Sequence, residues 1–135
     1  MTEFLLANIF WASLAAIAAV GLVWTIIRDG AKLIDHDAAI LLIKSDGGVF
    51  VDLRTAAAFT AGRIAHARHI PAAELKKRAA EIERYREKPV VLVCDNGMQS
   101  RRSLRELVAL GFAQARALRG GMVAWTDAQL PVLRK

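Results

Sequence analysis

The chain has 135 residues, of which 55% are hydrophobic, and a formal net charge of +6 at neutral pH. This length suits one small domain with an appended segment. The basic residues are dispersed and accompanied by few aromatic residues, so we expect no nucleic-acid partner. The single cysteine excludes an internal disulfide framework and is typical of a reducing compartment.

The first predicted element is a transmembrane helix over residues 4–27, a run without any charged side chain. As an α-helix it would be about 36 Å long, enough to cross a hydrocarbon core of about 30 Å. Glu3 stands where a signal peptide carries basic residues, and the run is longer than a typical signal core. We therefore expect a retained anchor over residues 1–28, rather than a cleaved signal or a buried core helix, and a domain over residues 29–135.

The charge distribution predicts how the anchor is oriented. Every Lys and Arg residue follows the apolar run, beginning with Arg28. Because basic residues favour the cytoplasmic side, we expect a single-pass inner-membrane protein with an external N-terminus and a cytoplasmic domain. The lipid bilayer is thus one expected partner. The small residues of the anchor also allow pairing with a second copy or with another membrane protein.

Beyond the anchor, predicted strands and helices alternate. Apolar runs predict strands at residues 33–34, 49–53, 90–93 and 115–118, and a short strand that ends at Pro71. Helical patterns lie between them, at residues 38–43, 56–61, 72–87 and 100–111, with a short helix near Trp125. This alternation indicates an α/β domain with a parallel sheet of about five strands and right-handed crossovers.

Several side chains predict where these helices begin and end. Thr55 is a candidate N-cap for the helix over residues 56–61, and Ser100 for the helix that ends near Gly111. Residues 72–87 form one charged amphipathic helix in this interpretation. Its predicted inner side consists of Leu75, Ala79, Ile82 and Tyr85.

The only cysteine lies at a position where chemistry is expected. Residues 90–93 form a β-branched run, typical of a central parallel strand, and Cys94 follows it directly. Sites in such sheets form at the carboxyl ends of strands. A glycine-containing loop and a helix N-terminus come next, and their N–H groups favour the thiolate form of a cysteine. We therefore expect Cys94 to be catalytic. The expected substrate-binding residues are Asp95, Asn96, Gly97, Met98, Gln99, Ser100 and Arg101.

A series of short motifs runs through residues 33–133. The motifs are residues 51–54, Phe59 with residues 62–64, residues 70–71, residues 93–94 with Gly97 and Ser100, residues 110–112, and residues 118–121 with Trp125 and residues 130–131. In order and spacing they resemble a single-domain rhodanese, a sulfurtransferase-like module. The resemblance implies a five-stranded parallel sheet flanked by helices, with Cys94 as the catalytic residue and Asp52 and Arg54 in support.

The resemblance also implies a double displacement. The Cys94 thiolate attacks the sulfane sulfur of a donor such as thiosulfate, sulfite leaves, and the resulting persulfide passes its outer sulfur to a thiol acceptor. No metal or organic cofactor is implied. We therefore predict a membrane-anchored sulfurtransferase.

Two residues of the loop support an alternative without catalysis. Asp95 and Gln99 occupy positions where active members of the family often carry basic residues. A carboxylate at position 95 opposes both a thiolate and an anionic donor. The alternative is a weakly active or inactive adaptor that binds a membrane-protein partner, with the anchor raising its effective concentration.

Two other chemistries are disfavoured by the residues present. A cysteine phosphatase needs an arginine six residues after the cysteine, where this chain has Ser100. A metal site at His66 and His69 would lack a neighbouring acidic or thiol ligand, so no metal is expected.

Overall fold

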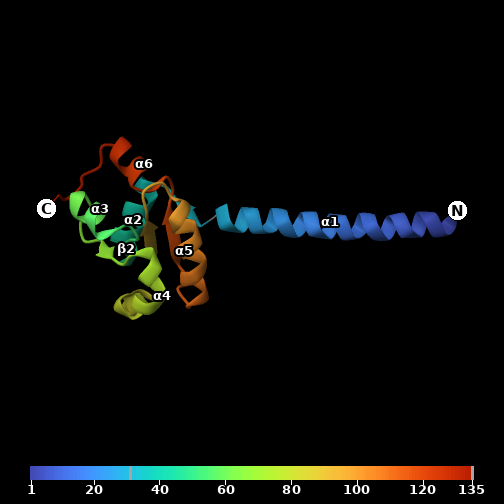
Figure 1. Ribbon diagram of the computed structural model, residues 1–135, viewed down its shortest axis with the longest axis horizontal. Coiled ribbons are helices and arrows are strands. Elements are labelled where there is room, and N and C mark those ends of the chain that lie inside the picture. Colours follow the sequence, from blue (N-terminus) through green and yellow to red (C-terminus); the bar gives the residue numbers. More distant parts are fainter. Residues whose placement is uncertain (31, 135) are drawn as a thin grey trace. The chain divides into compact units, whose positions relative to one another are not determined.

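The computed structural model describes residues 1–30 and 32–134 of the chain (Figure 1). These residues form two compact units, Met1–Lys32 and Leu33–Lys135. The first unit consists of the helix α1 (Thr2–Gly30), and its stretch Thr2–Ile27 is long and apolar enough to cross a membrane by length and composition. The apolar side chains of this stretch are exposed, so it is not the buried core helix considered as an alternative.

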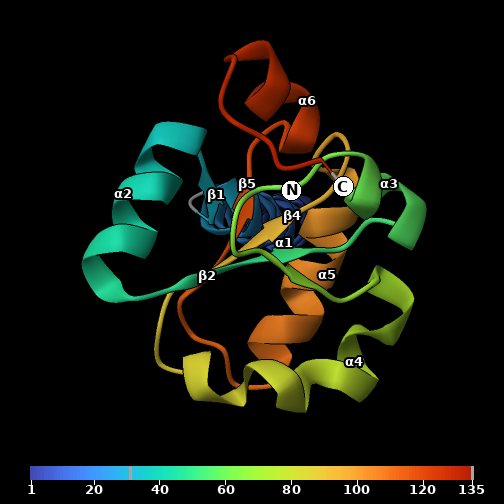
Figure 2. The same ribbon diagram turned by 90° about the vertical axis from the view of Figure 1, so that its left-hand side faces the viewer.

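The second unit is built on a five-stranded sheet in which every neighbouring pair of strands is parallel. The strand order is β1-β5-β4-β2-β3, with β4 at the centre (Figure 2). The strands are β1 (Leu33–Ile34), β2 (Val49–Asp52), β3 (Arg68–His69), β4 (Val90–Val93) and β5 (Ala115–Leu118). The predicted five-stranded parallel α/β architecture is thereby confirmed.

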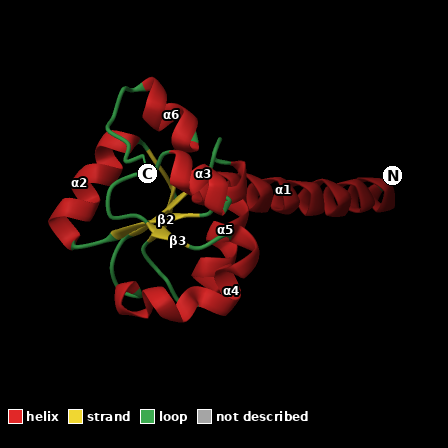
Figure 3. Cartoon of the chain, turned by 60° about the vertical axis from the view of Figure 1, so that its left-hand side comes forward, coloured by secondary structure: helices red, strands yellow, loops and turns green. Residues whose placement is uncertain are grey.

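Helices cover both faces of this sheet (Figures 2 and 3). They are α2 (His36–Asp46), α3 (Ala56–Ala61), α4 (Leu75–Arg78), α5 (Met98–Ala109) and α6 (Gly121–Asp127). The α4 and α5 face contains Leu92, Leu104 and Leu107, whereas the α2 and α6 face contains Val93 and Trp125. Because successive side chains of a strand point to opposite faces, the four residues of β4 supply both cores and are all buried.

The predicted single helix over residues 72–87 is wrong. The segment is divided into a 3₁₀ turn (η1, Ala72–Glu74), α4, and a second 3₁₀ segment (η2, Ala79–Tyr85). Ile82 has non-helical backbone angles, φ −114° and ψ 18°, and its side chain is fully buried. Burial of Ile82 against the sheet thus prevails over regular helix geometry, although the predicted inner side chains do pack against the core.

The predicted N-cap at Ser100 is also wrong, whereas the one at Thr55 is confirmed by a hydrogen bond from the Ala58 N–H to its Oγ1, 3.3 Å long. Helix α5 begins at Met98, and Gly97 is its N-cap. Gly97 has φ +93°, a conformation that glycine adopts without the steric cost of a Cβ atom. The helix therefore starts closer to the cysteine than predicted, and Ser100 lies within its first turn.

The two central strands bring the candidate site together. Asp52 and Val93, the last residues of β2 and β4, are register partners, and the Leu53 N–H donates to the Val93 carbonyl at 2.8 Å. The segments that follow β2 and β4 consequently leave the sheet side by side.

Candidate active site

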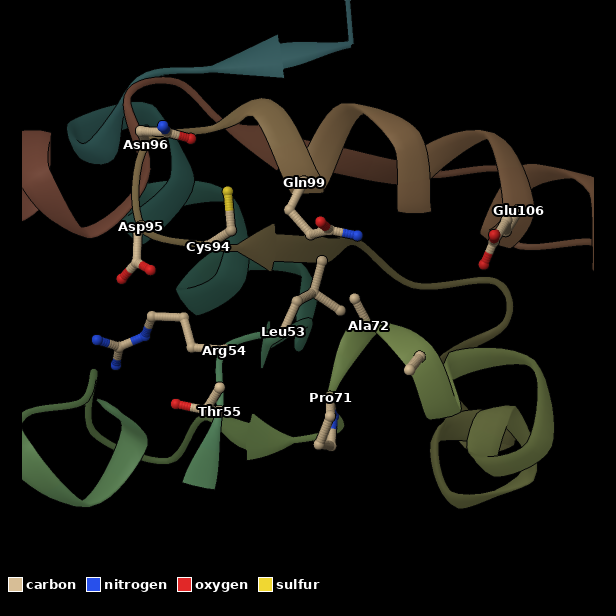
Figure 4. A pocket seen from close by; sticks show the side chains of 11 residues that line it. Leu53, Arg54, Thr55, Pro71, Ala72, Cys94, Asp95, Asn96, Gln99 and Glu106 are labelled. Carbon is tan, nitrogen blue, oxygen red and sulfur yellow. The ribbon is translucent and has the colours of Figure 1, made fainter. Parts of the chain in front are cut away.

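Cys94 lies immediately after β4, at the carboxyl edge of the sheet, with only 2% of its surface exposed (Figure 4). The Gly97 N–H donates a hydrogen bond to Cys94 Sγ with an N–S distance of 2.9 Å. This contact is possible because the left-handed turn at Gly97 directs its amide back towards the strand end. A backbone N–H in this position stabilises negative charge on sulfur.

The first turn of α5 adds further donors next to this sulfur-binding amide. The first helical hydrogen bond runs from the Arg101 N–H to the Gly97 carbonyl, so the N–H groups before Arg101 have no acceptor within the helix. Met98 uses its N–H for the Asn96 side chain, at 3.1 Å. Ser100 is completely buried, and its Oγ has no hydrogen-bond partner among the described residues. An unpaired buried hydroxyl is uncommon in folded proteins.

The N-terminus of α6 holds the backbone of residues 94–97, the cysteine loop between β4 and α5. The Met122 N–H donates to the Cys94 carbonyl at 2.8 Å, and the Val123 N–H donates to the Asp95 carbonyl at 3.0 Å. Gly121, with φ +56°, allows this approach, since a Cβ atom there would lie 2.2 Å from the Cys94 carbonyl oxygen. The loop is therefore fixed both from α5 and from α6.

Asp52 and Arg54 form a buried ion pair beside the cysteine. Their side chains are 2% and 8% exposed, and Arg54 Nη2 lies 2.8 Å from Asp52 Oδ2. Arg54 also donates from Nε to both carboxylate oxygens, from its backbone N–H to Oδ1, and from Nη2 to the Gly62 carbonyl. Through the Gly62 carbonyl, this pair joins the segment after β2 to the end of α3.

Cys94 faces an open pocket of about 610 Å³. The lining residues are Leu53, Arg54, Thr55, Pro71, Ala72, Ala73, Cys94, Asp95, Asn96, Gln99 and Glu106. Of the predicted loop residues, Asp95, Asn96 and Gln99 thus line the pocket together with the cysteine. Gly97 is buried in the loop and Ser100 in the first turn of α5, whereas the Met98 side chain is 75% exposed and Arg101 is also exposed.

Sequence reasoning missed one charged residue of the pocket and its opposite wall. Glu106 is seven residues after Gln99 on α5, so the helical period places both on one face of that helix. Pro71 and Ala72 follow β3, whose carboxyl end lies beside that of β2. Applying the strand-end rule to every parallel strand, and not only to β4, would have found this wall.

His66 and His69 are the two histidines that the sequence brings up as possible metal ligands. Among the described residues, no group of three or more His, Cys, Asp or Glu side chains is placed to hold a metal ion. His69 instead stacks on Phe59, with ring centroids 4.5 Å apart, and its Nε2 lies 2.8 Å from the Arg54 carbonyl oxygen. It therefore supports the segment that carries Arg54.

Cys94 thus follows the central strand of a five-stranded parallel sheet and precedes a helix whose start folds around it. This arrangement is typical of one class of α/β domain. The rhodanese-like domain family matches residues 35–128, and the chain belongs to this family. The uncharacterized protein YibN of Escherichia coli strain K12 is 35% identical over 104 residues, which cover 76% of this chain and 73% of YibN.

Two further similar proteins are a named sulfurtransferase and a rhodanese-related protein of known structure. The thiosulfate sulfurtransferase GlpE of Pseudomonas putida is 34% identical over 96 residues, covering 70% of this chain and 84% of GlpE. The crystal structure of a rhodanese-related protein from Thermoplasma volcanium superimposes with a TM-score of 0.69 at 25% identity, covering 77% of this chain and 99% of that one. The resemblance stated from the sequence motifs is confirmed.

Proposed function

We propose that this protein is a membrane-anchored sulfurtransferase that carries sulfane sulfur as a persulfide on Cys94. The proposal rests on one observation above all: Cys94 Sγ accepts the Gly97 N–H at 2.9 Å on the wall of an open pocket. The Ser100 hydroxyl in the first turn of α5 also supports it, since it has no partner among the described residues and a persulfide on Cys94 is the acceptor that we propose for it. Membership of the rhodanese-like family, with a relative named thiosulfate sulfurtransferase, also supports this proposal.

The reaction balances without an external oxidant. The Cys94 thiolate attacks the outer sulfur of thiosulfate, the S–S bond of the donor breaks, and sulfite leaves with the electron pair of that bond. The outer sulfur and its negative charge remain on Cys94 as a persulfide anion. An acceptor thiolate then attacks this outer sulfur, which regenerates the Cys94 thiolate and produces the persulfide of the acceptor.

The anchor completes the proposal. The stretch Thr2–Ile27 of α1 has the length and composition of a membrane span, and the basic residues follow this stretch. We place the N-terminus outside the inner membrane and the rhodanese-like domain in the cytoplasm. Sulfur would then be delivered to acceptors close to the membrane surface.

Intact-mass spectrometry of the full-length chain in a non-ionic detergent tests the proposal. Incubation with thiosulfate or an organic persulfide is expected to add about 32 mass units, one sulfur atom, at Cys94. Reduction should remove it, and the variant Cys94→Ser should not acquire it. Absence of the adduct with every sulfane donor would reject the proposal.

The acidic residue beside the cysteine favours the second candidate, a rhodanese-fold adaptor for a membrane partner. Asp95 lines the pocket next to Cys94 and disfavours an anionic donor. An adaptor would show no sulfur adduct, and its partner binding would survive Cys94→Ser. The mass measurement therefore separates the two candidates.

A further inference from the structure

The pocket beside Cys94 is lined by more negative than positive side chains. Three charged side chains line it: Arg54, Asp95 and Glu106. Arg54 is committed to Asp52, to which it donates from Nε and Nη2, so that buried pair contributes little net charge. Asp95 and Glu106 have no ion-pair partner within the described part of the chain. Two uncompensated carboxylates thus border the cavity in which a substrate meets Cys94.

The two carboxylates come from different elements. Asp95 belongs to the cysteine loop, whereas Glu106 lies in the third turn of α5. Figure 4 shows them at opposite ends of the lining side chains. A substrate that reaches Cys94 therefore passes these two carboxylates, and negative side chains along a cleft concentrate cationic ligands.

The size and walls of the pocket indicate an organic substrate. A volume of about 610 Å³ is within the range of sites that bind organic molecules, about 300–1,000 Å³, and far exceeds a thiosulfate ion. The wall formed by Leu53, Pro71 and Ala72 is apolar. It suits the carbon chain of a thiol that reaches the sulfur.

We propose that the thiol that takes sulfur from Cys94 carries a positive charge near its sulfur atom, and that Asp95 and Glu106 select it. The inference rests on the proposed function. The acceptor thiolate attacks the outer sulfur of the Cys94 persulfide, the S–S bond to Cys94 breaks, and the Cys94 thiolate leaves with the electron pair. Because the thiolate of a cationic thiol has no net charge, it enters the acidic pocket without the repulsion that an anionic thiol meets.

Discharge of the persulfide by matched thiols tests this selectivity. The full-length chain in a non-ionic detergent is loaded with sulfur and freed of donor, and loss of the added mass is timed with cysteamine, 2-mercaptoethanol or 3-mercaptopropionate. The decisive quantity is the cysteamine rate divided by the mercaptopropionate rate. Comparing this ratio between protein variants cancels the intrinsic reactivities of the thiols.

The ratio is expected to fall about tenfold in the double variant Asp95→Asn, Glu106→Gln, and to fall with added salt in the unmodified protein. The double variant Asp46→Asn, Glu87→Gln is the matched control, because it removes two exposed carboxylates outside the pocket. It should keep the original ratio. An unchanged ratio in the pocket variant, or an equal fall in the control, would overturn the proposal.

Two peptides distinguish a small aminothiol from a protein cysteine as the source of this chemistry. Blocked tripeptides Lys-Cys-Lys and Glu-Cys-Glu replace the small thiols in the same assay. A preference for the basic peptide that exceeds the preference for cysteamine indicates a protein cysteine flanked by basic residues, and a smaller one indicates an aminothiol. If sulfur never loads onto Cys94, the proposed function fails. If it loads and leaves without charge selectivity, only this inference fails.

Discussion

The segments that follow β2 and β4 lie side by side, but their buried polar side chains differ in whether they have hydrogen-bond partners. After β2, the Asp52 carboxylate and the Arg54 guanidinium are buried and satisfy each other. After β4, the Ser100 hydroxyl is buried and has no hydrogen-bond partner in the part of the chain that the structure describes, and the Gly97 N–H donates to Cys94 Sγ. The charged groups of the first segment are paired with each other, whereas the described residues leave one buried hydroxyl of the second without a partner. We therefore interpret the first segment as a structural support and the second as the candidate active site.

Breaking the buried ion pair between Asp52 and Arg54 should have the largest effect on stability. The variant Arg54→Met leaves the Asp52 carboxylate buried and unpaired, so we expect a loss of about 3–5 kcal/mol in the free energy of unfolding. Chemical denaturation of the full-length chain in detergent, followed by circular dichroism, measures it. The double variant Asp52→Asn, Arg54→Met should recover part of the loss.

The matched control for Arg54 is Arg78, whose partners Glu74 and Glu81 are exposed. Hydrogen bonding to Arg78 lowers the pKa of the Glu81 carboxyl below its usual 4.5, so this pair stabilises the fold above that pH and is lost as the pH falls. Because the pair is exposed to solvent, Arg78→Met should matter little at neutral pH. A loss as large as that of Arg54→Met would contradict the distinction.

The contact between α6 and the cysteine loop should have the next largest effect. A Cβ atom in Gly121→Ala would lie 2.2 Å from the Cys94 carbonyl oxygen, on a residue with positive φ. We expect a loss of about 1–3 kcal/mol and slower sulfur uptake, because the loop must move away from Gly97 and α5. Denaturation and the mass assay measure the two effects.

Gly62→Ala is the control for this variant, since the backbone there is extended, with φ 173°. The nearest atom to a Cβ at position 62 is Val132 Cγ2, at 4.0 Å. This variant should keep both stability and sulfur uptake. Normal uptake by Gly121→Ala would show that α6 does not position the cysteine.

Ser100→Ala should have the smallest effect on stability. It tests whether the segment after β4 serves sulfur uptake and not folding. Removing an unpaired buried hydroxyl should leave stability unchanged or raise it by about 1 kcal/mol. Sulfur uptake should nevertheless slow by about tenfold, because the persulfide loses a hydrogen-bond donor. Ser103→Ala, one turn later on α5 and also buried, should not slow uptake. Equal slowing by both variants would reject a specific role for Ser100.

Sequence patterns predicted the elements whose neighbours in the chain determine them. The β-branched run of β4 requires burial on both faces, and the alternation of strands and helices requires crossovers, so the parallel sheet followed directly. The position of Cys94 at the end of that strand was predicted for the same reason. Thr55 caps its own helix, which is a local interaction.

Contacts between distant parts of the chain decided the rest. Ile82 divides the segment after Pro71 because its side chain is buried in the core on the α5 face of the sheet. The N-cap of α5 is Gly97 and not Ser100, because the loop is also fixed by α6. Helix α6 follows more than twenty residues later in the chain.

By itself, the sequence determined an apolar N-terminal helix, a parallel α/β domain and a cysteine at the end of its central strand, because burial patterns and helix periods are properties of neighbouring residues. Only the tertiary structure decided the surroundings of that cysteine. It brings Arg54 into a buried ion pair with Asp52, buries Ser100 in the first turn of α5, and adds Glu106 to the pocket. Each of these depends on how separate elements pack, since the charge around a site is set by side chains that meet across the fold.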